Sequence, residues 1–400
     1  MGLSLKPQHL RHYKDLALLL FRYGRRDLVA RAGLNELLPQ EPERDQQAEA
    51  TAEQLAADVE RLGPTYIKLG QLLSTRPDII PASYAQALAR LQDRCEPLPF
   101  TEIETVLAEE LGLVASRALR VDREPLATAS MSQVHRASLE DGREIVLKVQ
   151  RPQQVRVGTS LAREVFFLNQ LASAAPDLPV PRVLGYDRET NLLEYNIQTR
   201  MLGVAYADTN LTPDVRHEVI FSVGRFLRRL HAIPQQPFHD SAHFPTDRTP
   251  ADFKRRLSEY FDVVTRRLEE DGRAWPLEIP FETVRERALA ALPETPEFVA
   301  LHSNPGPPHA FVDRSTGRFQ GLIDFGDACI SHPALDVWRW RWPTERAAAL
   351  AGYTADAPAS DDFMRTWKAF AVAASAMLVA FFPDRENEAT TDLRKSLSDL

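Results

Sequence analysis

The stretch LHSNPGPPHAFV, residues 301–312, has residue types and a spacing that could support phosphoryl transfer. Loops that catalyse this reaction typically read His-x-Asp, with an Asn five residues after the Asp. The frame is kept by His302 and by positions 304 and 309, but these two positions hold Asn304 and His309. A catalytic Asp accepts the proton of the attacking hydroxyl, and an amide cannot accept it. The loop is therefore a candidate catalytic site with an altered proton acceptor.

Asn304 can still accept a hydrogen bond through its amide oxygen, and phosphoryl transfer depends mainly on positioning and charge stabilisation. A general base contributes about 10²–10⁴-fold, so its loss weakens transfer without abolishing it. His309 is a candidate metal ligand, although imidazole suits zinc-like ions better than Mg²⁺. The alternative is that His309 contacts phosphate.

Residues 324–336, DFGDACISHPALD, supply a candidate metal ligand. Asp324 follows an apolar run, Gly321-Leu322-Ile323, and lies 15 residues after His309. A carboxylate at this point could hold a divalent ion, with Mg²⁺ expected, that bridges nucleotide phosphates. The alternative is an ordinary Asp in a turn at the end of a strand. The in-frame loop before it favours the metal site.

Lys148 lies in the apolar stretch EIVLKV, just after a predicted hairpin. A buried Lys is costly without a partner, and the next predicted helix offers Glu164, 16 residues on. A strand Lys paired with a helix Glu is the arrangement that holds the α- and β-phosphates of ATP in kinases. The alternative is a Lys on the exposed face of an edge strand.

The segment before Lys148, residues 125–137, occupies the place of a glycine-rich phosphate cover but contains no glycine. Its small side chains would still let the backbone approach a phosphate, although they adopt positive φ less freely than Gly. The residues concerned are Ala127, Ala129, Ser130 and Ser132.

The elements that must position these residues follow from the periodicity. Residues 1–38 and 51–115 read helical, with a polar linker at 39–50. Asp141-Gly142 between two β-rich runs predicts a two-residue hairpin turn, and strands are also expected within 179–203. Helices are predicted at 160–174, 212–232, 250–271, 281–292 and from 333 onward, with a hairpin at 310–327 and a frayed tail beyond 384. The pattern predicts an α+β, two-lobed fold with an N-terminal helical extension. The expected domains are 1–115, 116–203 and 204–400.

Residues 64–78, PTYIKLGQLLSTRPD, place Lys68 and Gln71 on one face of a predicted helix that is otherwise apolar. These two side chains predict either an inward polar contact or a solvated stripe.

With these motifs in place, the first 152 residues resemble the UbiB/AarF family of atypical kinase-like proteins. The resemblance rests on KLGQ, ATASMSQ and VLKVQRP. From about residue 160 the chain is similar instead to aminoglycoside-phosphotransferase-like proteins, on LAREVFFLNQL, VGRFLRRLHAIP and GLIDFGDACISHPALDVW. Both families share the two-lobed kinase fold, so one fold is implied for the whole chain.

The resemblance implies roles for individual residues. Lys148 and Glu164 would be the nucleotide ion pair, and Gln198 to Met201 the adenine hinge. Asp324 would bind the metal and Asp336 would brace the catalytic loop. Lys68 and Gln71 would project over the nucleotide site, an element that in the UbiB/AarF family favours ATPase-like or small-molecule work.

Composition limits the partners. The net charge of −8 predicts no bulk attraction to nucleic acid, and two widely spaced cysteines predict a reducing, cytoplasmic setting. No signal peptide is expected, and the apolar run 369–382 predicts a buried helix. Residues 1–35 carry seven Lys or Arg against two Asp and predict a basic amphipathic helix. This helix either packs on its own protein or contacts a membrane surface.

Three functions remain open from the sequence alone. The leading hypothesis is an ATP- and Mg²⁺-dependent phosphotransferase or ATPase that acts on a small-molecule or lipid-like substrate. The second is a catalytically impaired, nucleotide-binding regulatory module, motivated by Asn304. The third is a kinase fold used for nucleotide-independent chemistry, with His302 or His309 as acid/base.

Overall fold

The computed structural model divides into two compact units, and each is described separately. The first consists of residues 1–96 with 128–131, and the second of residues 97–127 and 132–400. In the first unit, helix α3 (Ala52–Leu62) buries Leu55, Ala56 and Val59 on one face. The predicted basic helix and the KLGQ segment lie outside the described residues. The structure describes residues 52–62, 87–88, 97–104, 107, 119–128, 132–150, 160–190, 193–247 and 249–400.

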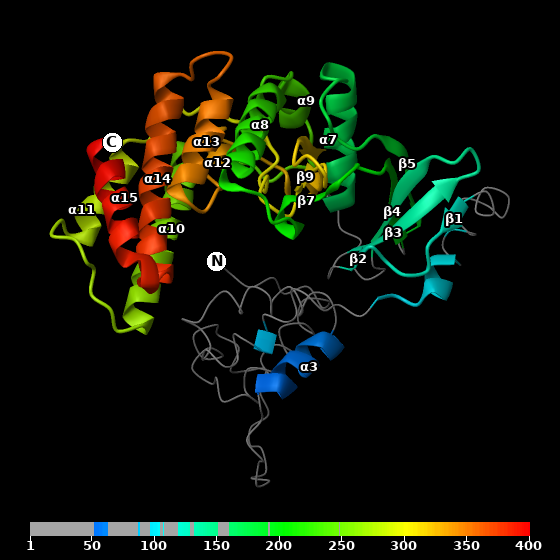
Figure 1. Cartoon of the computed structure of the whole chain (residues 1–400), viewed down its shortest axis with the longest axis horizontal. Coiled ribbons are helices and arrows are strands. Elements are labelled where there is room, and N and C mark those ends of the chain that lie inside the picture. Colours follow the sequence, from blue (N-terminus) through cyan, green and yellow to red (C-terminus); the bar gives the residue numbers. More distant parts are fainter. Residues whose placement is uncertain are drawn as a thin grey trace, which may run out of the picture. The chain divides into compact units, whose positions relative to one another are not determined.

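The second unit begins with an antiparallel sheet (Figure 1). Its strands follow one another across the sheet in the order β1, β3, β4, β6, β5. In β4 and β6, Lys148 lies opposite Asn196 and Val146 opposite Gln198. Because side chains alternate along a strand, these four share one face. The strands are β1 (Leu119–Val121), β2 (Ala127–Thr128), β3 (Ser132–Leu139), β4 (Glu144–Gln150), β5 (Val183–Thr190) and β6 (Leu193–Thr199).

The opposite face of the sheet is apolar and is covered by the segment before β1. Ile145, Leu147 and Val149 of β4 are fully buried there against Ile103 and Leu107. This packing fixes which side of β4 faces inward, and therefore turns Lys148 toward the other face.

The β3–β4 hairpin is confirmed, but its predicted two-residue turn is wrong. The Gly142 N–H donates to Leu139 O at 2.9 Å, and the Leu139 N–H donates to Arg143 O at 3.0 Å. The loop therefore has three residues, with Gly142 at φ +83° in the left-handed region. Asp-Gly fits both turn types, so the dipeptide located the hairpin without determining its loop length.

Helix α7 (Ser160–Ala174) follows the sheet and contributes to the core of the helical lobe. The predicted helices after it are confirmed: α8 (Pro213–His231), α10 (Pro250–Glu270), α11 (Phe281–Ala290), α13 (Pro343–Tyr353), α14 (Asp361–Phe381) and α15 (Glu386–Ser398). Shorter elements are β7 (Val204–Ala205), η2 (Tyr206–Asp208), α9 (Gln236–His239), β8 (Val299–Leu301), β9 (Ala310–Val312), β10 (Phe319–Leu322), η3 (Phe325–Asp327), β11 (Cys329–Ser331), α12 (Ala334–Val337) and η4 (Pro383–Arg385).

Helices α8 and α13 approach each other closely through a pair of glycines. A Cβ added to Gly224 would lie 2.1 Å from Ala349 O, and one added to Gly352 would lie 1.9 Å from Phe221 O. Both distances are far below van der Waals contact, so larger residues would separate the helices. This contact fixes His231, at the end of α8, near the catalytic loop.

The expected frayed tail beyond residue 384 is wrong, because this segment forms α15. Ala389, Leu393 and Leu397 are buried at helical spacing against α14. Arg346 of α13 pairs with Asp392 at 2.8 Å. The tail's charged composition hid this spacing, because most of its charges lie on the solvent side of an amphipathic helix, while Asp392 turns inward to Arg346.

Helix α14 confirms the prediction of a buried helix over the apolar run. Among the described residues, it is the one helix that length and composition would allow to cross a membrane, and 72% of its apolar window is buried within the protein.

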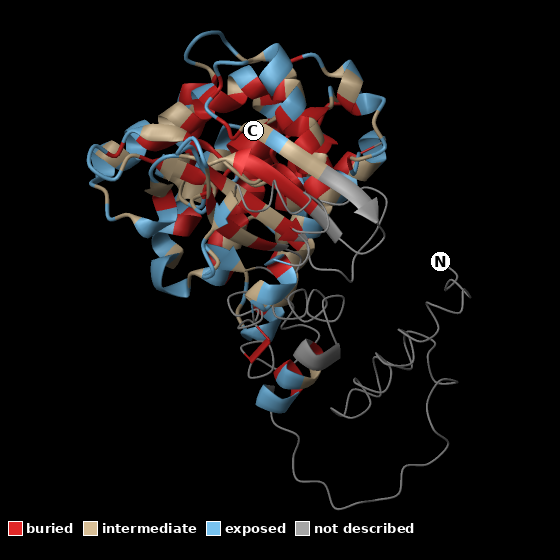
Figure 2. Ribbon diagram, turned by 90° about the vertical axis from the view of Figure 1, so that its right-hand side faces the viewer, coloured by how far each residue is buried: buried red, intermediate tan, exposed pale blue. Residues whose placement is uncertain are grey.

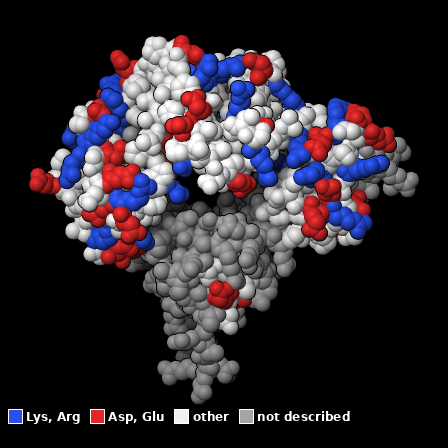
Figure 3. All heavy atoms as spheres, viewed as in Figure 1, with Lys and Arg blue, Asp and Glu red and all other residues white. Residues whose placement is uncertain are grey.

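Buried residues run through the interior of the helical lobe (Figure 2). The two-lobed α+β prediction is confirmed. Positive and negative side chains are interspersed over the face shown in Figure 3.

Candidate functional site

Lys148 and Glu164 form an ion pair between the sheet and α7. The Lys148 ammonium donates to both carboxylate oxygens of Glu164, at 2.7 and 2.9 Å. Their side chains are only 13% and 2% exposed. Burial acts to lower the pKa of Lys148, but the carboxylates of Glu164 and Asp324 outweigh it, so the pKa is raised. Lys148 is therefore charged at neutral pH and rigidly held.

Asp324 extends the charged cluster from the opposite side. Its Oδ1 lies 3.7 Å from Lys148 Nζ, and its Oδ2 lies 3.5 Å from His309 Nε2. Lys148 lowers the pKa of Asp324, against the effect of burial. Asp324 has φ +67°, which turns the chain sharply from β10 into η3. Its side chain, 48% exposed, remains accessible to a cation.

The position of Asp324 depends on close backbone packing just before it. A Cβ on Gly321 would lie 2.1 Å from Pro179 O, and Gly321 itself has φ +144°. The Leu322 N–H donates to the same Pro179 oxygen at 3.3 Å. Only glycine allows this approach, which ties β10 to the segment between α7 and β5.

The backbone of the catalytic loop is held by Asp336. This buried carboxylate accepts hydrogen bonds from the N–H groups of His302, at 2.9 Å, and Ser303, at 2.8 Å. Ser303 has φ +74°, a strained conformation for a residue with a side chain. His231 Nε2 donates to Asp336 at 3.1 Å, and His231 Nδ1 lies within hydrogen-bond distance of the Tyr353 hydroxyl, at 3.1 Å. Burial acts to raise the pKa of Asp336, but the contact with His231 and the other donors lower it overall.

His302 is part of this support rather than an accessible acid or base. It is fully buried, its Nε2 donates to Ile323 O at 3.0 Å, and its Nδ1 accepts from the Asn304 N–H at 3.3 Å. Its ring packs on Phe325 with centroids 4.5 Å apart. Burial lowers its pKa, so the ring is neutral. Neither nitrogen is free for a substrate, which argues against the predicted catalytic role of His302.

Asn304 and His309 are brought together by the loop between them. His309 Nδ1 donates to Asn304 O at 2.7 Å, because a carbonyl oxygen can only accept. In the neutral ring, Nε2 therefore carries the lone pair that faces Asp324 Oδ2. Two electron-pair donors 3.5 Å apart are spaced for a shared cation.

The β6 strand contributes two buried amides beside Lys148. Asn196 is fully buried, and neither its Oδ1 nor its Nδ2 has a hydrogen-bond partner in the structure as described. The same holds for Nε2 of Gln198, which is 2% exposed. An unpaired buried polar group costs about 1–3 kcal/mol, so these amides mark a place for a polar ligand or water. The sequence resemblance implied a role for Gln198 but not for Asn196, although both alternate with apolar residues in LEYNIQT.

Of the remaining predicted site residues, some lie in described elements and others lie outside the described residues. Met201 follows the end of β6, and Ala127 lies in β2. Ser132 begins β3, and its side chain is not described. Outside the described residues lie Lys68, Gln71, Ala129 and Ser130.

Curated proteins with similar sequences include kinase-like relatives. The "Probable protein kinase UbiB" of Pseudomonas putida is 31% identical over 257 residues, covering 60% of this chain and 45% of the relative. An uncharacterized protein of Synechocystis is 35% identical over 240 residues, covering 56% of this chain and 58% of the relative. Arabidopsis thaliana "Protein ACTIVITY OF BC1 COMPLEX KINASE 8, chloroplastic" is 50% identical over 102 residues, covering 25% and 13%. The chain thus spans less than two thirds of each relative's length.

Similar solved structures include two macrolide 2'-phosphotransferases. The type I enzyme is 19% identical, with a TM-score of 0.48, covering 76% of this chain and 99% of that chain. MphH from Brachybacterium faecium, as the apoenzyme, is 20% identical, with a TM-score of 0.46, covering 74% and 98%.

The family match covers residues 123–370, more than half of the chain, and its description is "Phosphotransferase enzyme family". Both resemblances drawn from the sequence, UbiB-like and phosphotransferase-like, are confirmed. The match spans every described element of the site, from Lys148 in β4 to Asp336 in α12. The chain belongs to the phosphotransferase enzyme family.

Proposed function

We propose that the chain binds ATP with a divalent cation and transfers phosphate slowly to a hydroxyl of a small-molecule or lipid-like substrate. The observation that carries this proposal is the position of Lys148 Nζ, which lies 2.7 Å from Glu164 and 3.7 Å from Asp324. A fixed ammonium beside an accessible carboxylate can bind phosphates and their cation together.

The residues present fit such a cation. Mg²⁺ takes one or two carboxylates and completes its shell with phosphate oxygens and water, so Asp324 can suffice. His309 Nε2, 3.5 Å from Asp324 Oδ2, adds a nitrogen donor that Mn²⁺ accepts more readily than Mg²⁺. The described residues contain no group of three or more His, Cys, Asp or Glu side chains that could hold a metal ion. In this proposal, phosphate oxygens and water therefore complete the coordination of the cation. When bound, the cation would neutralise charge on the phosphates.

The nucleobase belongs, in this proposal, at the end of β6. Gln198 presents an unpaired Nε2 on the face of the sheet that carries Lys148. The chain then continues to Met201, where the sequence resemblance implies the adenine hinge. A base edge that hydrogen-bonds Gln198 would satisfy this buried amide.

Asn304 would orient the acceptor hydroxyl without accepting its proton. The loop around it is braced by Asp336, so its backbone geometry does not depend on a charged side chain at 304. Positioning and charge stabilisation carry most of this reaction, so transfer remains feasible but slow. Nucleotide-independent acid/base chemistry by His302 is not favoured, because both of its nitrogens are engaged.

Calorimetric titration with a non-hydrolysable ATP analogue, with and without Mg²⁺ or Mn²⁺, tests the binding half of the proposal. We expect binding in the wild type, a loss of the metal-dependent part in Asp324→Ala, and a large loss in Lys148→Met. Lys254→Met, at an exposed position on α10, is the matched control. Phosphate release, followed with and without a panel of hydroxylated small molecules and lipids, tests transfer. If the protein binds the ATP analogue neither with Mg²⁺ nor with Mn²⁺, the proposal is overturned.

A further inference from the structure

Arg163, the residue before Glu164, connects α7 to the helical lobe. Its Nη1 donates to Gly326 O at 2.7 Å, and its Nε donates to His243 O at 3.0 Å. Consecutive helix residues diverge by about 100° around the axis, so Glu164 can face Lys148 while Arg163 faces the helical lobe. One turn of helix thus contacts both the phosphate-binding Lys and the loop that carries Asp324.

The first acceptor lies in the metal loop itself. Gly326 belongs to η3, two residues after Asp324. A guanidinium that donates to a carbonyl makes a charge-assisted hydrogen bond, which is stronger than a neutral one. Arg163 therefore restricts the loop just where the chain leaves the strained turn at Asp324.

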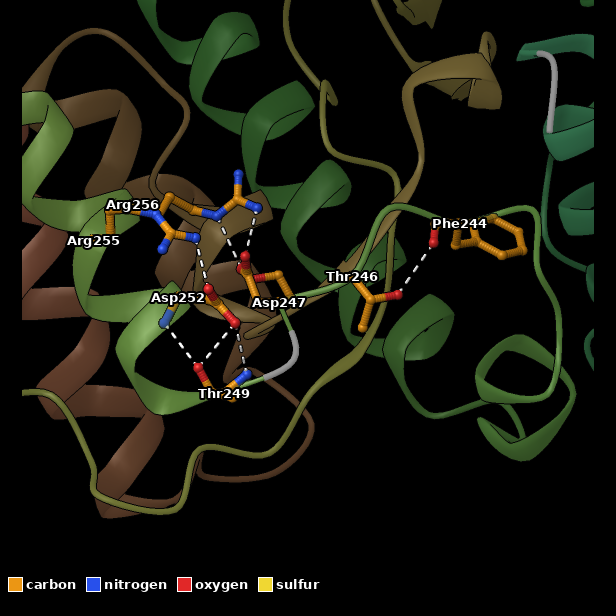
Figure 4. A network of polar contacts seen from close by, with 8 residues as sticks. Phe244, Thr246, Asp247, Thr249, Asp252, Arg255 and Arg256 are labelled. Carbon is orange, nitrogen blue, oxygen red and sulfur yellow. Dashed lines mark hydrogen bonds and ion pairs between the residues drawn. The ribbon is translucent and has the colours of Figure 1, made fainter. Parts of the chain in front are cut away.

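The second acceptor lies on a firmly anchored segment between α9 and α10. Figure 4 shows its polar contacts: the Thr246 hydroxyl donates to Phe244 O at 3.1 Å, and Arg256 holds Asp247 with two bonds of 2.9 Å. The Asp247 N–H also donates to Ile330 O at 3.1 Å, in β11. His243 O is therefore a fixed point from which Arg163 can hold the metal loop.

Aromatic packing runs parallel to the Arg163 contacts. Phe167 of α7 lies 5.0 Å from Phe325 and 4.8 Å from Phe238, as ring centroids. Phe166 lies 5.6 Å from the His243 ring. These ring contacts place α7 against the lobe, and among the described residues it is Arg163 whose side chain is seen to donate to the carbonyl of Gly326.

We propose that Arg163 is a positioning residue that holds the Asp324 loop in register with Glu164. This inference rests on the proposed function, since the position of the Asp324 loop relative to Glu164 matters only if Lys148 and Asp324 act on one nucleotide–metal complex. In this view the ion pair and the metal loop are assembled before any ligand binds. Arg163 would act through the carbonyls that it holds rather than by contact with the nucleotide or the metal.

Hydrogen–deuterium exchange of the ligand-free protein tests the proposal directly. We expect Arg163→Met to raise exchange in residues 324–328 severalfold, with exchange in α13 and α14 unchanged. Arg163→Lys keeps the charge but has a single nitrogen for two carbonyls, so it should restore protection in part. The matched control is Arg225→Met, which removes an exposed pair with Asp356.

Binding and turnover give the functional readout. We expect Arg163→Met to reduce the metal-dependent part of nucleotide affinity, and turnover, about tenfold, as the loss of one or two charge-assisted bonds implies. Metal-free nucleotide affinity should change less than about twofold, because Arg163 does not contact the phosphate-binding Lys148. A merely structural role would lower both affinities together.

The outcomes separate the two proposals. Unchanged exchange at 324–328 in Arg163→Met would overturn the positioning role, whatever the activity. Raised local exchange in a protein that binds no nucleotide would keep the contact but remove the proposed function. If Arg163→Met fails to fold, Arg163→Lys decides: a local rise at an unchanged melting temperature supports the role, and a uniform rise contradicts it.

Discussion

The two sides of the site differ in the side chains that they present. One side combines Lys148, Glu164 and Asp324, which are charged and lie within 3.7 Å of a neighbour. The other side, the catalytic loop, presents Asn304 and His309, with His302 buried as a neutral ring. The first, charged side carries the groups that the proposed function assigns to phosphates and a cation, whereas the second, loop side lacks the carboxylate that would accept a proton.

The backbone of the loop side is nevertheless supported by a buried carboxylate. Asp336 accepts two loop N–H groups and holds Ser303 in a left-handed conformation. Strained backbone of this kind, held by surrounding structure, is typical of functional sites. The difference therefore leads us to expect that nucleotide binding, which the proposed function assigns to the charged side, does not depend on the missing proton acceptor of the loop.

The largest effect is expected from Asp336→Ala, which removes the support of the loop side. Three donors would lose a buried acceptor, at a cost of about 3–5 kcal/mol in the free energy of unfolding. Urea denaturation measures this cost. A loss below about 1 kcal/mol would show that the loop holds its conformation without Asp336.

Lys148→Met should disrupt the charged side and leave the loop side intact. Turnover should fall about 10²–10³-fold, as when one fixed donor to a developing charge is removed. Nucleotide affinity should fall as well, because Glu164 would remain buried without its partner. Affinity equal to that of the Lys254→Met control would remove Lys148 from the site.

His309→Asn sharpens the comparison at the point where the two sides meet. Replacing the imidazole with an amide oxygen should shift the preference of the metal site from Mn²⁺ toward Mg²⁺ by about tenfold. The measurement is metal-dependent nucleotide affinity with each ion. An unchanged ratio would mean that His309 contacts phosphate or protein rather than the cation.

Acidification should give the smallest effect, through Asp336. Its folded-state pKa is lowered, so the carboxylate adds stability above the ordinary Asp value of about 3.9, and this is lost as the pH falls through the folded value. The stability difference between wild type and Asp336→Asn should therefore narrow below about pH 4. A difference that is constant from pH 7 to pH 3 would contradict the lowered pKa.

Local spacing predicted much of this site. The hairpin and the helix after it brought Lys148 and Glu164 together, and the frame from His302 to Asp324 located the loop and the carboxylate. The prediction of a frayed tail was wrong because the charged composition of this segment hid the helical spacing of Ala389, Leu393 and Leu397. Whether KLGQ covers the site stays a prediction, since Lys68 and Gln71 lie outside the described residues.

Other features depend on contacts that no sequence pattern encodes. Arg163 reaches carbonyls 80 and 163 residues away, and a backbone acceptor leaves no trace in residue type. The buried state of His302, with both nitrogens bonded, likewise depends on Ile323 and the fold of the loop. Sequence could therefore predict which groups meet, but not which were left free to react.

Turnover and nucleotide affinity of Asn304→Asp, measured beside wild type, test the central claim most directly. If the charged side is complete and only the proton acceptor is missing, restoring a carboxylate should raise turnover by about 10²-fold or more. Affinity for the ATP analogue with metal should stay within about twofold, because residue 304 orients the acceptor hydroxyl and not the nucleotide. Unchanged turnover in a folded, nucleotide-binding Asn304→Asp would contradict the account.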